Sequence, residues 1–519
     1  MSSKRAINIG DISFEIITQI LHYCEYPSIL RFATSYRKLV AQSASLQLHI
    51  ELEVNGLELV KGSFKRDVTY TVILEDIRQF RDAWLNLSFG RPIMRSLGKS
   101  QMLLWELREG FYIKAYSQSA GGRNANALQF IPLDAKSSDP PPLLFNFTFD
   151  KFTADPGQEL VAVLSQDDLR THIHVHLCSS MTGLAHPLTH NPRLTAEFDS
   201  NFLRSASHFG IEIVGHLVLI LLPDVRGHAF EILIWNWKFG IFLNRISSRR
   251  GICDFTFLDQ RHLVVLAATS SGREYLDTLA LLVFVISDGT STQHDLPPGQ
   301  LQVVDAPVSR PILRLEFPRT KEAFKISRNR LLLQSDPTPG RILYAKSAAF
   351  VCPHAITLGM TFSFCQVNSS SDEAPYYRVF IDGRFLLDRI RTNAHVETEV
   401  LSWSVWGPNA TRWFLNVVPP DYWISWMSRS RFIASPPNTP YHFVFDFSSP
   451  AIGRFRDRFA QLRPGRGEPG LVNRYLEHEL HQLATGSLPG PNVVTVGADN
   501  PSIITIGFDR PIASRLPYQ

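Results

Sequence analysis

The sequence contains few cysteines, and none of them is arranged to build a framework. Its 519 residues include five, and no two form a CxxC pair: Cys24, Cys178, Cys253, Cys352 and Cys365. This usage excludes a disulfide-rich secreted domain and a cysteine-based zinc finger. Scattered single cysteines are typical of reduced, mostly buried thiols, so we expect an intracellular protein.

Charged residues are also scarce, at 19% of the chain against the ~25% typical of soluble domains. Hydrophobic residues make up 44%. This combination excludes wholesale disorder and a long coiled coil, both of which need many charges. Lys and Arg number 52 and Asp and Glu 48, a net charge of +4. So small an excess gives no reason to expect a nucleic-acid partner.

Long apolar runs are missing as well. The most apolar stretch, Ile211 to Leu222, contains Glu212 and His216 and is shorter than the ~20 residues that span a bilayer. The opening MSSKRAINIGDISFE lacks the apolar centre of a secretory signal. We therefore expect no membrane partner and a cytoplasmic or nuclear location.

Motifs for catalysis or cofactor binding are not convincing. His172, His174 and His176 alternate along a predicted strand, but no Cys or carboxylate accompanies them at ligand spacing. LVNRYLEHELHQLA is one residue short of the HExxH zinc spacing, and GRGEPG matches GxGxxG without a preceding strand. Five arginines within residues 454–466 are typical of a solvated face. We predict no catalytic residue, no metal and no cofactor, and thus no enzyme.

Aromatic residues and turn formers are plentiful: 35 Phe, 14 Tyr, 9 Trp, 33 Pro and 30 Gly. From residue 101 onward, short apolar or alternating runs indicate many strands. A strand, a turn with glycine and another strand recur, with the glycines at Gly183, Gly240, Gly289, Gly383 and Gly453. The first spacings, 57 and 49 residues, are close to the ~40–50-residue period of propeller blades.

The repeats predict one large β domain over residues 101–519. WNWKFG resembles the last strand and turn of a WD-type blade, and RLLLQSDPTPGRILYAKSA indicates a less regular repeat. We expect a seven-bladed (or eight-bladed) β-propeller, with a pair of β-sandwiches as the alternative fold. SIITIGFD is expected to pair with a strand in the Trp105–Tyr116 region and close the ring.

The first hundred residues have helical rather than alternating periodicity. Apolar residues recur at three- and four-residue steps from Asp11 to Leu48. Ser13 is placed to cap the first helix, Pro27 to end it and Ser28 to cap the second. A third helix is expected near Ser43 to Glu53. Three short helices have little interior volume, so several apolar side chains must be buried on something else.

The segment DISFEIITQILHYCEYPSILRFATSYRKLVAQSASLQLHIEL resembles an F-box, in particular that of the large basidiomycete (fungal) family. Ile12-Ser13 stands where the family has Leu-Pro, with Glu15 following, and Tyr36-Arg37-Lys38 stands at the usual Arg-Arg position. EDIRQFRDAWLNLSF is similar to the helix that follows the F-box in that family. The resemblance implies a three-helix F-box over residues 1–50 and a helical connector over residues 51–100.

F-box proteins dock an apolar helix face on a Skp-type adaptor, which joins a cullin–RING ubiquitin ligase. The resemblance implies adaptor-binding roles for Ile12, Ile16, Ile20 and Leu30. The protein is thereby expected to be a substrate-receptor subunit in ubiquitin-dependent protein degradation, whose propeller holds an unknown protein substrate. Two alternatives stay open: a propeller scaffold outside any ligase with a structural helical cap, and a propeller hydrolase or lectin-like binder.

Overall fold

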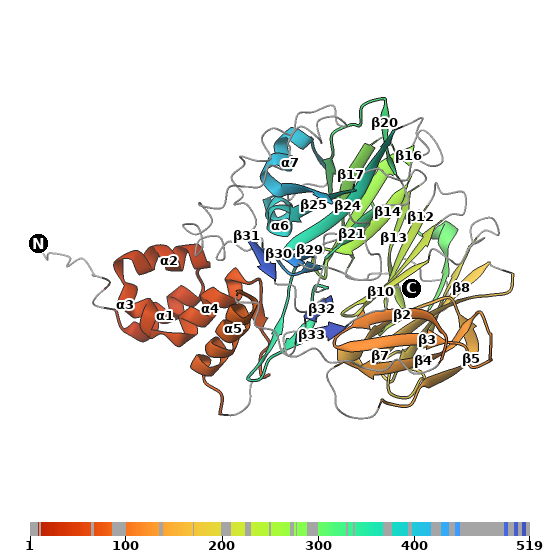
Figure 1. Ribbon diagram of the computed structural model, residues 1–519, viewed down its shortest axis with the longest axis horizontal. Helices are drawn as coiled ribbons and strands as arrows, with labels where there is room; N and C mark the ends of the chain where they lie inside the picture. Colours follow the sequence, from red (N-terminus) through yellow and green to blue (C-terminus); the bar gives the residue numbers. More distant parts are fainter. Residues whose placement is uncertain are drawn as a thin grey trace, which may run out of the picture.

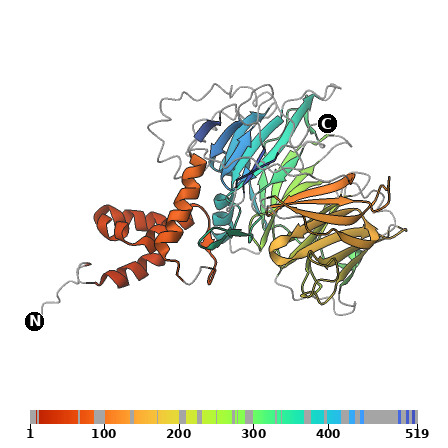
Figure 2. The ribbon, with the colours of Figure 1, turned by 60° about the horizontal axis from the view of Figure 1, so that its bottom comes forward.

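The chain is mainly β, with helices gathered at its N-terminal side (Figure 1). The computed structural model describes residues 9, 12–63, 67–85, 100–133, 139–169, 171–198, 209–223, 230–248, 251–269, 275–276, 278–287, 299–327, 331–335, 338–366, 376–392, 397–416, 427–434, 442–446, 492–496, 503–506 and 511–514. Within these, the first N-terminal helices project away from the sheets, and the last two adjoin the β domain (Figures 1 and 2). The expected class, a β protein with an N-terminal helical region, is confirmed.

The N-terminal region has one helix more than the three expected before residue 55. Its helices are α1 (Phe14–His22), α2 (Tyr26–Ser35), α3 (Arg37–Gln42), α4 (Ala44–Val54) and α5 (Tyr70–Leu85). Tyr36, with φ −125° and ψ 45°, leaves helical geometry and separates α3 from α2. Helix α4 runs across residue 50, where the sequence places the end of the F-box-like module.

Two of the three predicted capping features of these helices were wrong. Ser13 does cap α1, since its side chain accepts a hydrogen bond from the Ile16 amide. Pro27, however, lies in the first turn of α2, where its missing N–H costs nothing. Helix α2 therefore begins at Tyr26 with Glu25 at its N-cap, and Ser28 is inside the helix and caps nothing.

Six regions of the described chain form antiparallel sheets of four or more strands. The first sheet contains β2 (Met102–Arg108), β3 (Phe111–Tyr116), β4 (Ala125–Pro132) and β5 (Leu143–Phe149), and the second contains β6 (Lys151–Asp155), β7 (Leu160–Gln166), β8 (His172–Ser179) and β9 (Arg193–Glu197), with β18 (Gln300–Gln302) added in parallel. The third sheet contains β10 (Gly210–Val214), β11 (Leu217–Pro223), β12 (Phe230–Asn236) and β13 (Ile241–Ser248), and the fourth contains β14 (Ile252–Phe257), β15 (His262–Thr269), β17 (Thr278–Val285) and β19 (Leu313–Glu316), with β26 (Glu399–Leu401) added in parallel. The fifth sheet contains β16 (Tyr275–Leu276), β20 (Phe324–Ser327), β21 (Leu332–Gln334), β24 (Thr357–Gln366), β25 (Tyr376–Asp382) and β27 (Thr411–Asn416), and the sixth contains β28 (Met427–Ser428), β29 (Arg431–Ala434), β30 (His442–Asp446) and β31 (Asn492–Val496).

Neighbouring sheets pack face to face, so the core is a row of layers. The first and second sheets share a core that contains Ile113 of β3 and Val163 of β7, and the second and third share one that contains Leu177 of β8 and Val218 of β11. Shared cores continue in the same way through the fifth sheet. Strand alternation explains this, because successive residues of a strand point to opposite faces and both faces here are apolar. Burial on both faces makes the central strands continuous apolar runs, as in β11 and β15.

One predicted repeat contains a helix instead of a second strand. Gly383 was expected in a turn between strands, but it is the first residue of α6 (Gly383–Thr392). Leu386, Leu387 and Ile390 fall at helical spacing and pack on the core between the fourth and fifth sheets. Gly383 is required there, since a Cβ would lie 2.0 Å from the Ala355 carbonyl oxygen. A second helix, α7 (Trp403–Ala410), covers the same core.

The less regular repeat forms no sheet of its own. Part of it is β21, which pairs with β24, and part is β22 (Ile342–Tyr344), which forms a hairpin with β23 (Ala349–Val351). Strand β1 (Glu58–Leu59), just after α4, pairs with β23. This β22–β23 hairpin thus connects the N-terminal helices to the β domain.

The predicted ring closure does not occur among the described residues. The last segment forms β32 (Ile503–Ile506), which pairs with β33 (Pro511–Ser514) in a sheet of two. Strands β2 and β3, the expected partners, pair with each other, and β3 also pairs with β4. Strands β32 and β33 lie close in the chain, so their hairpin forms with little loss of entropy.

Candidate functional site

The N-terminal helices have a small core of their own. Ile17 and Leu21 of α1 pack with Ile29 of α2, Val40 of α3 and Leu46 of α4. All five side chains are buried, and Ile29 and Leu46 are fully so. One face of each helix is therefore used to hold the four helices together.

The outward face of α1 is apolar, although it lies in water. Ile16 is 51% exposed and Ile20 is 53% exposed. Tyr23, just after the helix, is 92% exposed. Their spacing of four and three residues places them in one line along the helix. Leu30 of α2 is 48% exposed. We call Ile16, Ile20, Tyr23 and Leu30 the outer apolar face.

Of the four residues predicted to bind an adaptor, Ile16, Ile20 and Leu30 thus belong to this face. The fourth, Ile12, does not. Ile12 is half-buried and packs against the inner core of the helices. Tyr23 was missed by the sequence reasoning. A signal for it was present, because it follows Ile16 by seven residues and Ile20 by three, the spacing of one helical face.

Polar contacts between helices fix the geometry of the outer apolar face. The Tyr26 amide donates to Glu53 Oε2 at 2.8 Å, and His49 Nε2 lies 3.2 Å from the Cys24 carbonyl oxygen. Both contacts join α4 to the turn between α1 and α2. The face is thus presented by helices whose relative positions are set by packing and by hydrogen bonds, as recognition by a preformed surface needs.

Helices α4 and α5 are anchored to the β domain. Their buried residues form one core with the β22–β23 hairpin: Leu48, Leu52, Leu57, Ile73, Leu74, Ile77, Leu343, Ala348, Phe350 and Cys352. Two arginines of the β domain reach carbonyls at the end of α4: Arg384 donates to Glu53 and Val54, and Arg429 to Asn55. The outer apolar face is therefore held in a fixed position relative to the sheets.

Gly56, between α4 and β1, makes this close connection possible. It has φ +59°, a conformation that glycine adopts without strain. A Cβ there would also lie 2.8 Å from the Ile356 side chain. A larger residue would be strained at the point where the helices join the β domain, and the Ile356 side chain would have to move.

The three alternating histidines lie on one face of β8, as the sequence predicts, and each has a protein partner. His172 contacts Asp167, His174 contacts Thr195, and His176 contacts Ser165. His176 also stacks on Phe147 of the adjacent sheet, with ring centroids 4.1 Å apart. Burial lowers the pKa of His176 to about 4, with further lowering from His174 and Arg193.

No group of three or more His, Cys, Asp or Glu suited to a metal ion occurs in the described part of the chain. The LVNRYLEHELHQLA, GRGEPG and five-arginine segments lie within residues 447–491, outside the described residues. The tryptophans Trp403, Trp406 and Trp413 pack around Phe317 in the core between the fourth and fifth sheets. They serve packing there.

Among the described residues, no helix is both long enough and apolar enough to cross a membrane. Cys24, Cys178, Cys352 and Cys365 are free thiols. Burial raises the pKa of the Cys178 thiol to about 11, so this thiol is protonated at neutral pH.

No protein-family model and no curated protein matches this chain. Among solved structures, it is similar to hydrazine synthase of Kuenenia stuttgartiensis, with TM-score 0.34, 8% identity and coverage of 78% of this chain and 99% of that one. It is also similar to the WD40 domain of SCAP from fission yeast, with TM-score 0.27, 9% identity and coverage of 67% and 77%. Both TM-scores lie below 0.5, and neither likeness bears on what the chain does.

Proposed function

We propose that this protein is the substrate-receptor subunit of a Skp–cullin–F-box ubiquitin ligase. In this proposal the outer apolar face binds a Skp-type adaptor, and the β domain, a propeller of seven or eight blades, holds the target protein. Such a subunit breaks and forms no bonds. It accelerates ubiquitin transfer by holding the target lysine near the charged enzyme.

The observation that carries the proposal is the exposure of Ile16, Ile20 and Leu30. Apolar side chains gathered on a rigid helix face are typical of sites where a partner lays a groove or another helix against them. The core of these helices does not need them, since Ile17, Leu21 and Ile29 fill it. A partner would bury the exposed half of each outer side chain and gain about 1 kcal/mol from each.

The β domain supports the second half of the proposal through its topology. Its first and third sheets are antiparallel meanders of consecutive strands, β2–β5 and β10–β13, and the second sheet contains another, β6–β9. These three sheets pack face to face. This arrangement is typical of propeller blades, whose connecting loops offer a broad binding face.

The test is co-purification of the full chain with a Skp-type adaptor. The double variant Ile16→Asp/Ile20→Asp places two charges on the outer apolar face and is expected to abolish binding. The control is Leu169→Asp/Val304→Asp, which charges two apolar residues of the β domain that are 82% and 81% exposed, and it should bind as the wild type does. Equal binding by the wild type and the α1 double variant would overturn the proposal, provided far-UV circular dichroism shows both folded.

A propeller scaffold outside any ligase is the second candidate. The core shared by α4, α5 and the β22–β23 hairpin favours it, because these helices act as a structural cap on the β domain. This candidate predicts that the wild-type chain does not co-purify with the adaptor. The same experiment therefore separates the two.

A further inference from the structure

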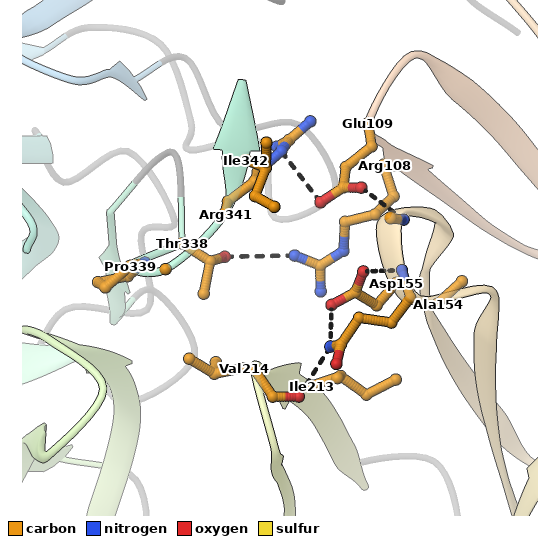
Figure 3. Close-up of a pocket in the computed structure, with 14 residues that line it drawn as sticks. Arg108, Glu109, Ala154, Asp155, Ile213, Val214, Thr338, Pro339, Arg341 and Ile342 are labelled. Carbon is orange, nitrogen blue, oxygen red and sulfur yellow. Dashed lines mark hydrogen bonds and ion pairs between the residues drawn. The ribbon is translucent and has the colours of Figure 1, made fainter. Parts of the chain in front are cut away.

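A cavity of about 210 Å³ lies where three sheets and the segment before the β22–β23 hairpin meet. The sheets contribute the turns between β2 and β3, β6 and β7, and β10 and β11, which Figure 3 shows around the space. Its polar lining comes from parts of the chain far apart in sequence: Arg108, Glu109, Asp155, Gln158, Thr338 and Arg341.

The guanidinium of Arg108 is already held by protein groups. Its Nε lies 2.9 Å from Glu106, its Nη2 donates to Glu212 and Thr153, and its Nη1 donates to Thr338 at 3.3 Å. Each of its three nitrogens therefore has a partner within the protein. Three N–H groups of Arg108 thus donate to protein acceptors, and its Nε is paired by charge with Glu106, so Arg108 organises the wall of the cavity.

The carboxylates of the cavity have capacity left to accept hydrogen bonds. Asp155 accepts from the Gln158 amide at 3.0 Å and from Gln158 Nε2 at 2.7 Å, one bond to each oxygen. Glu109 accepts from the Gly157 amide at 3.1 Å and pairs with Arg341 Nε at 3.2 Å. Each carboxylate oxygen can accept two hydrogen bonds. The cavity thus suits a ligand that donates.

The charged groups of the lining also favour a ligand that donates hydrogen bonds. The lining has two guanidinium groups, those of Arg108 and Arg341, and two carboxylates, those of Glu109 and Asp155. Arg108 pairs with Glu106 and Glu212, which lie outside the lining, and Arg341 pairs with Glu109, so Asp155 supplies the remaining negative charge. Burial raises the pKa of Glu109, and a cation placed beside this carboxyl would lower its pKa.

The size and opening of the cavity fit one side chain. Its volume exceeds that of a single water and falls below the ~300–1,000 Å³ of pockets that hold drug-sized ligands. Gly157 and Ile342, which line it, are exposed to solvent, so the cavity has a mouth on the surface.

Exposed apolar side chains lie on turns that contact the lining of the cavity. Gln158, a lining residue, accepts through its carbonyl from His186, whose ring packs edge-on against Trp237 with centroids 5.0 Å apart. The turns that carry His186 and Trp237 also carry exposed Leu184, Leu188 and Phe239. Such a surface is typical of contact with another protein, and it favours a protein segment over a free small amine.

We propose that this cavity binds the cationic side chain of a lysine or arginine in a partner protein, with Asp155 and Glu109 as its acceptors. This proposal adds a binding site for the target to the proposed function, and it rests on that function only in calling the partner a ligase target. The binding step itself needs the β domain and not the adaptor.

The test measures fluorescence anisotropy of the full-length protein with labelled five-residue peptides that differ at the central position. Peptides with a central arginine or lysine are expected to bind, and the peptide with citrulline, which has the shape of arginine without its charge, is expected to bind about ten-fold more weakly. Equal affinity for the arginine, lysine and citrulline peptides would overturn the proposal.

Two variants test the acceptors while keeping the turn folded. Asp155→Asn and Glu109→Gln each keep an oxygen for the backbone amide they cap and remove one negative charge. Each variant is expected to lower the affinity for the cationic peptides about ten-fold. The matched control, Glu159→Gln, removes an exposed carboxylate of the same β6–β7 turn that does not line the cavity, and should bind as the wild type does. Unchanged affinity in both acceptor variants would contradict the assignment.

The two proposals fail in different experiments. The Ile16→Asp/Ile20→Asp variant, which tests adaptor binding, should retain the affinity of the wild type for cationic peptides. Loss of co-purification with intact peptide binding would uphold both sites. If the wild type does not co-purify with the adaptor but still binds cationic peptides, the proposed cavity ligand stands and only the proposed ligase function is overturned.

Discussion

The N-terminal helices and the first three sheets depart in opposite ways from the rule that apolar groups lie inside and charges outside. In the helices, Ile16 and Ile20 are turned to water while five buried apolar residues fill the core. In the sheets, Glu106, Arg108 and Glu212 are drawn inward and satisfy one another. We propose that both arrangements serve recognition.

The two regions should respond differently to substitution. In the helices the unusual residues lie outside, and the fold does not rest on them. In the sheets the unusual residues lie inside, and the fold depends on their pairing. The predictions below use this contrast, beginning with the largest effect.

Replacing Arg108 by Met should be the most damaging change. It leaves Glu106 and Glu212 buried without their cation, and breaking a buried ion pair from one side costs about 3–5 kcal/mol. The measurement is urea unfolding followed by tryptophan fluorescence. The matched control is Arg391→Met, at an exposed arginine, which should change the free energy of unfolding by less than about 0.5 kcal/mol. A similar small effect at both positions would show that Arg108 is not needed for folding.

Replacing Ile29 by Ala should destabilise the N-terminal helices by about 2–5 kcal/mol, because it opens a cavity in their small core. Replacing Ile16 by Ala on the outer apolar face should change their stability by less than about 0.5 kcal/mol. Hydrogen exchange of the amides of α1 and α4 measures both. Comparable losses at the two positions would mean that the outer face also serves the fold.

Acidification should weaken the contact between the first and second sheets through His176. Its folded pKa of about 4 lies below the ordinary 6.5, so the unfolded chain binds a proton first as the pH falls. The stabilisation is fully present above pH 6.5 and is lost as the pH falls toward about 4. Its neighbours are His174 on the same strand, Arg193 on β9, Ser165 on β7 and Phe147 on β5.

The midpoint of urea unfolding at a series of pH values measures this effect. The variant His176→Gln should remove part of the decline between pH 6.5 and 4, while carboxylates such as Glu106 contribute equally to both proteins. A decline of the same size in the variant and the wild type would exclude His176 as its cause.

Sequence reasoning predicts local features well where one segment carries the whole signal. The helical periodicity around Ile17 and Leu21, the cap at Ser13 and the alternation in β8 all follow from neighbours in the chain. Helix α6 shows the limit. Its aromatic and apolar residues after Gly383 suit a strand as well as a helix, and packing on the core between the fourth and fifth sheets decides for the helix.

The outer apolar face could be predicted in part, and the cavity not at all. The spacing of Ile16 and Ile20 predicts that they lie on one face, whereas only the structure shows that Ile12 packs inward. The cavity brings Glu109, Asp155 and Arg341 together from three distant turns. No spacing in the chain connects these residues, because their meeting depends on how whole sheets stack.

The smallest expected effect sharpens the contrast at the start of α1. Ser13→Ala removes the side-chain oxygen that accepts from the Ile16 amide, and loss of such a cap costs about 0.5–1 kcal/mol. Ser13→Asn keeps an acceptor and should cost less. Because the capped turn carries Ile16, the alanine variant should raise hydrogen exchange in the first turn of α1 and leave the exchange of the β-domain amides unchanged. Equal exchange in the alanine and asparagine variants would show that the inner core, rather than the cap, holds this end of the outer apolar face in place.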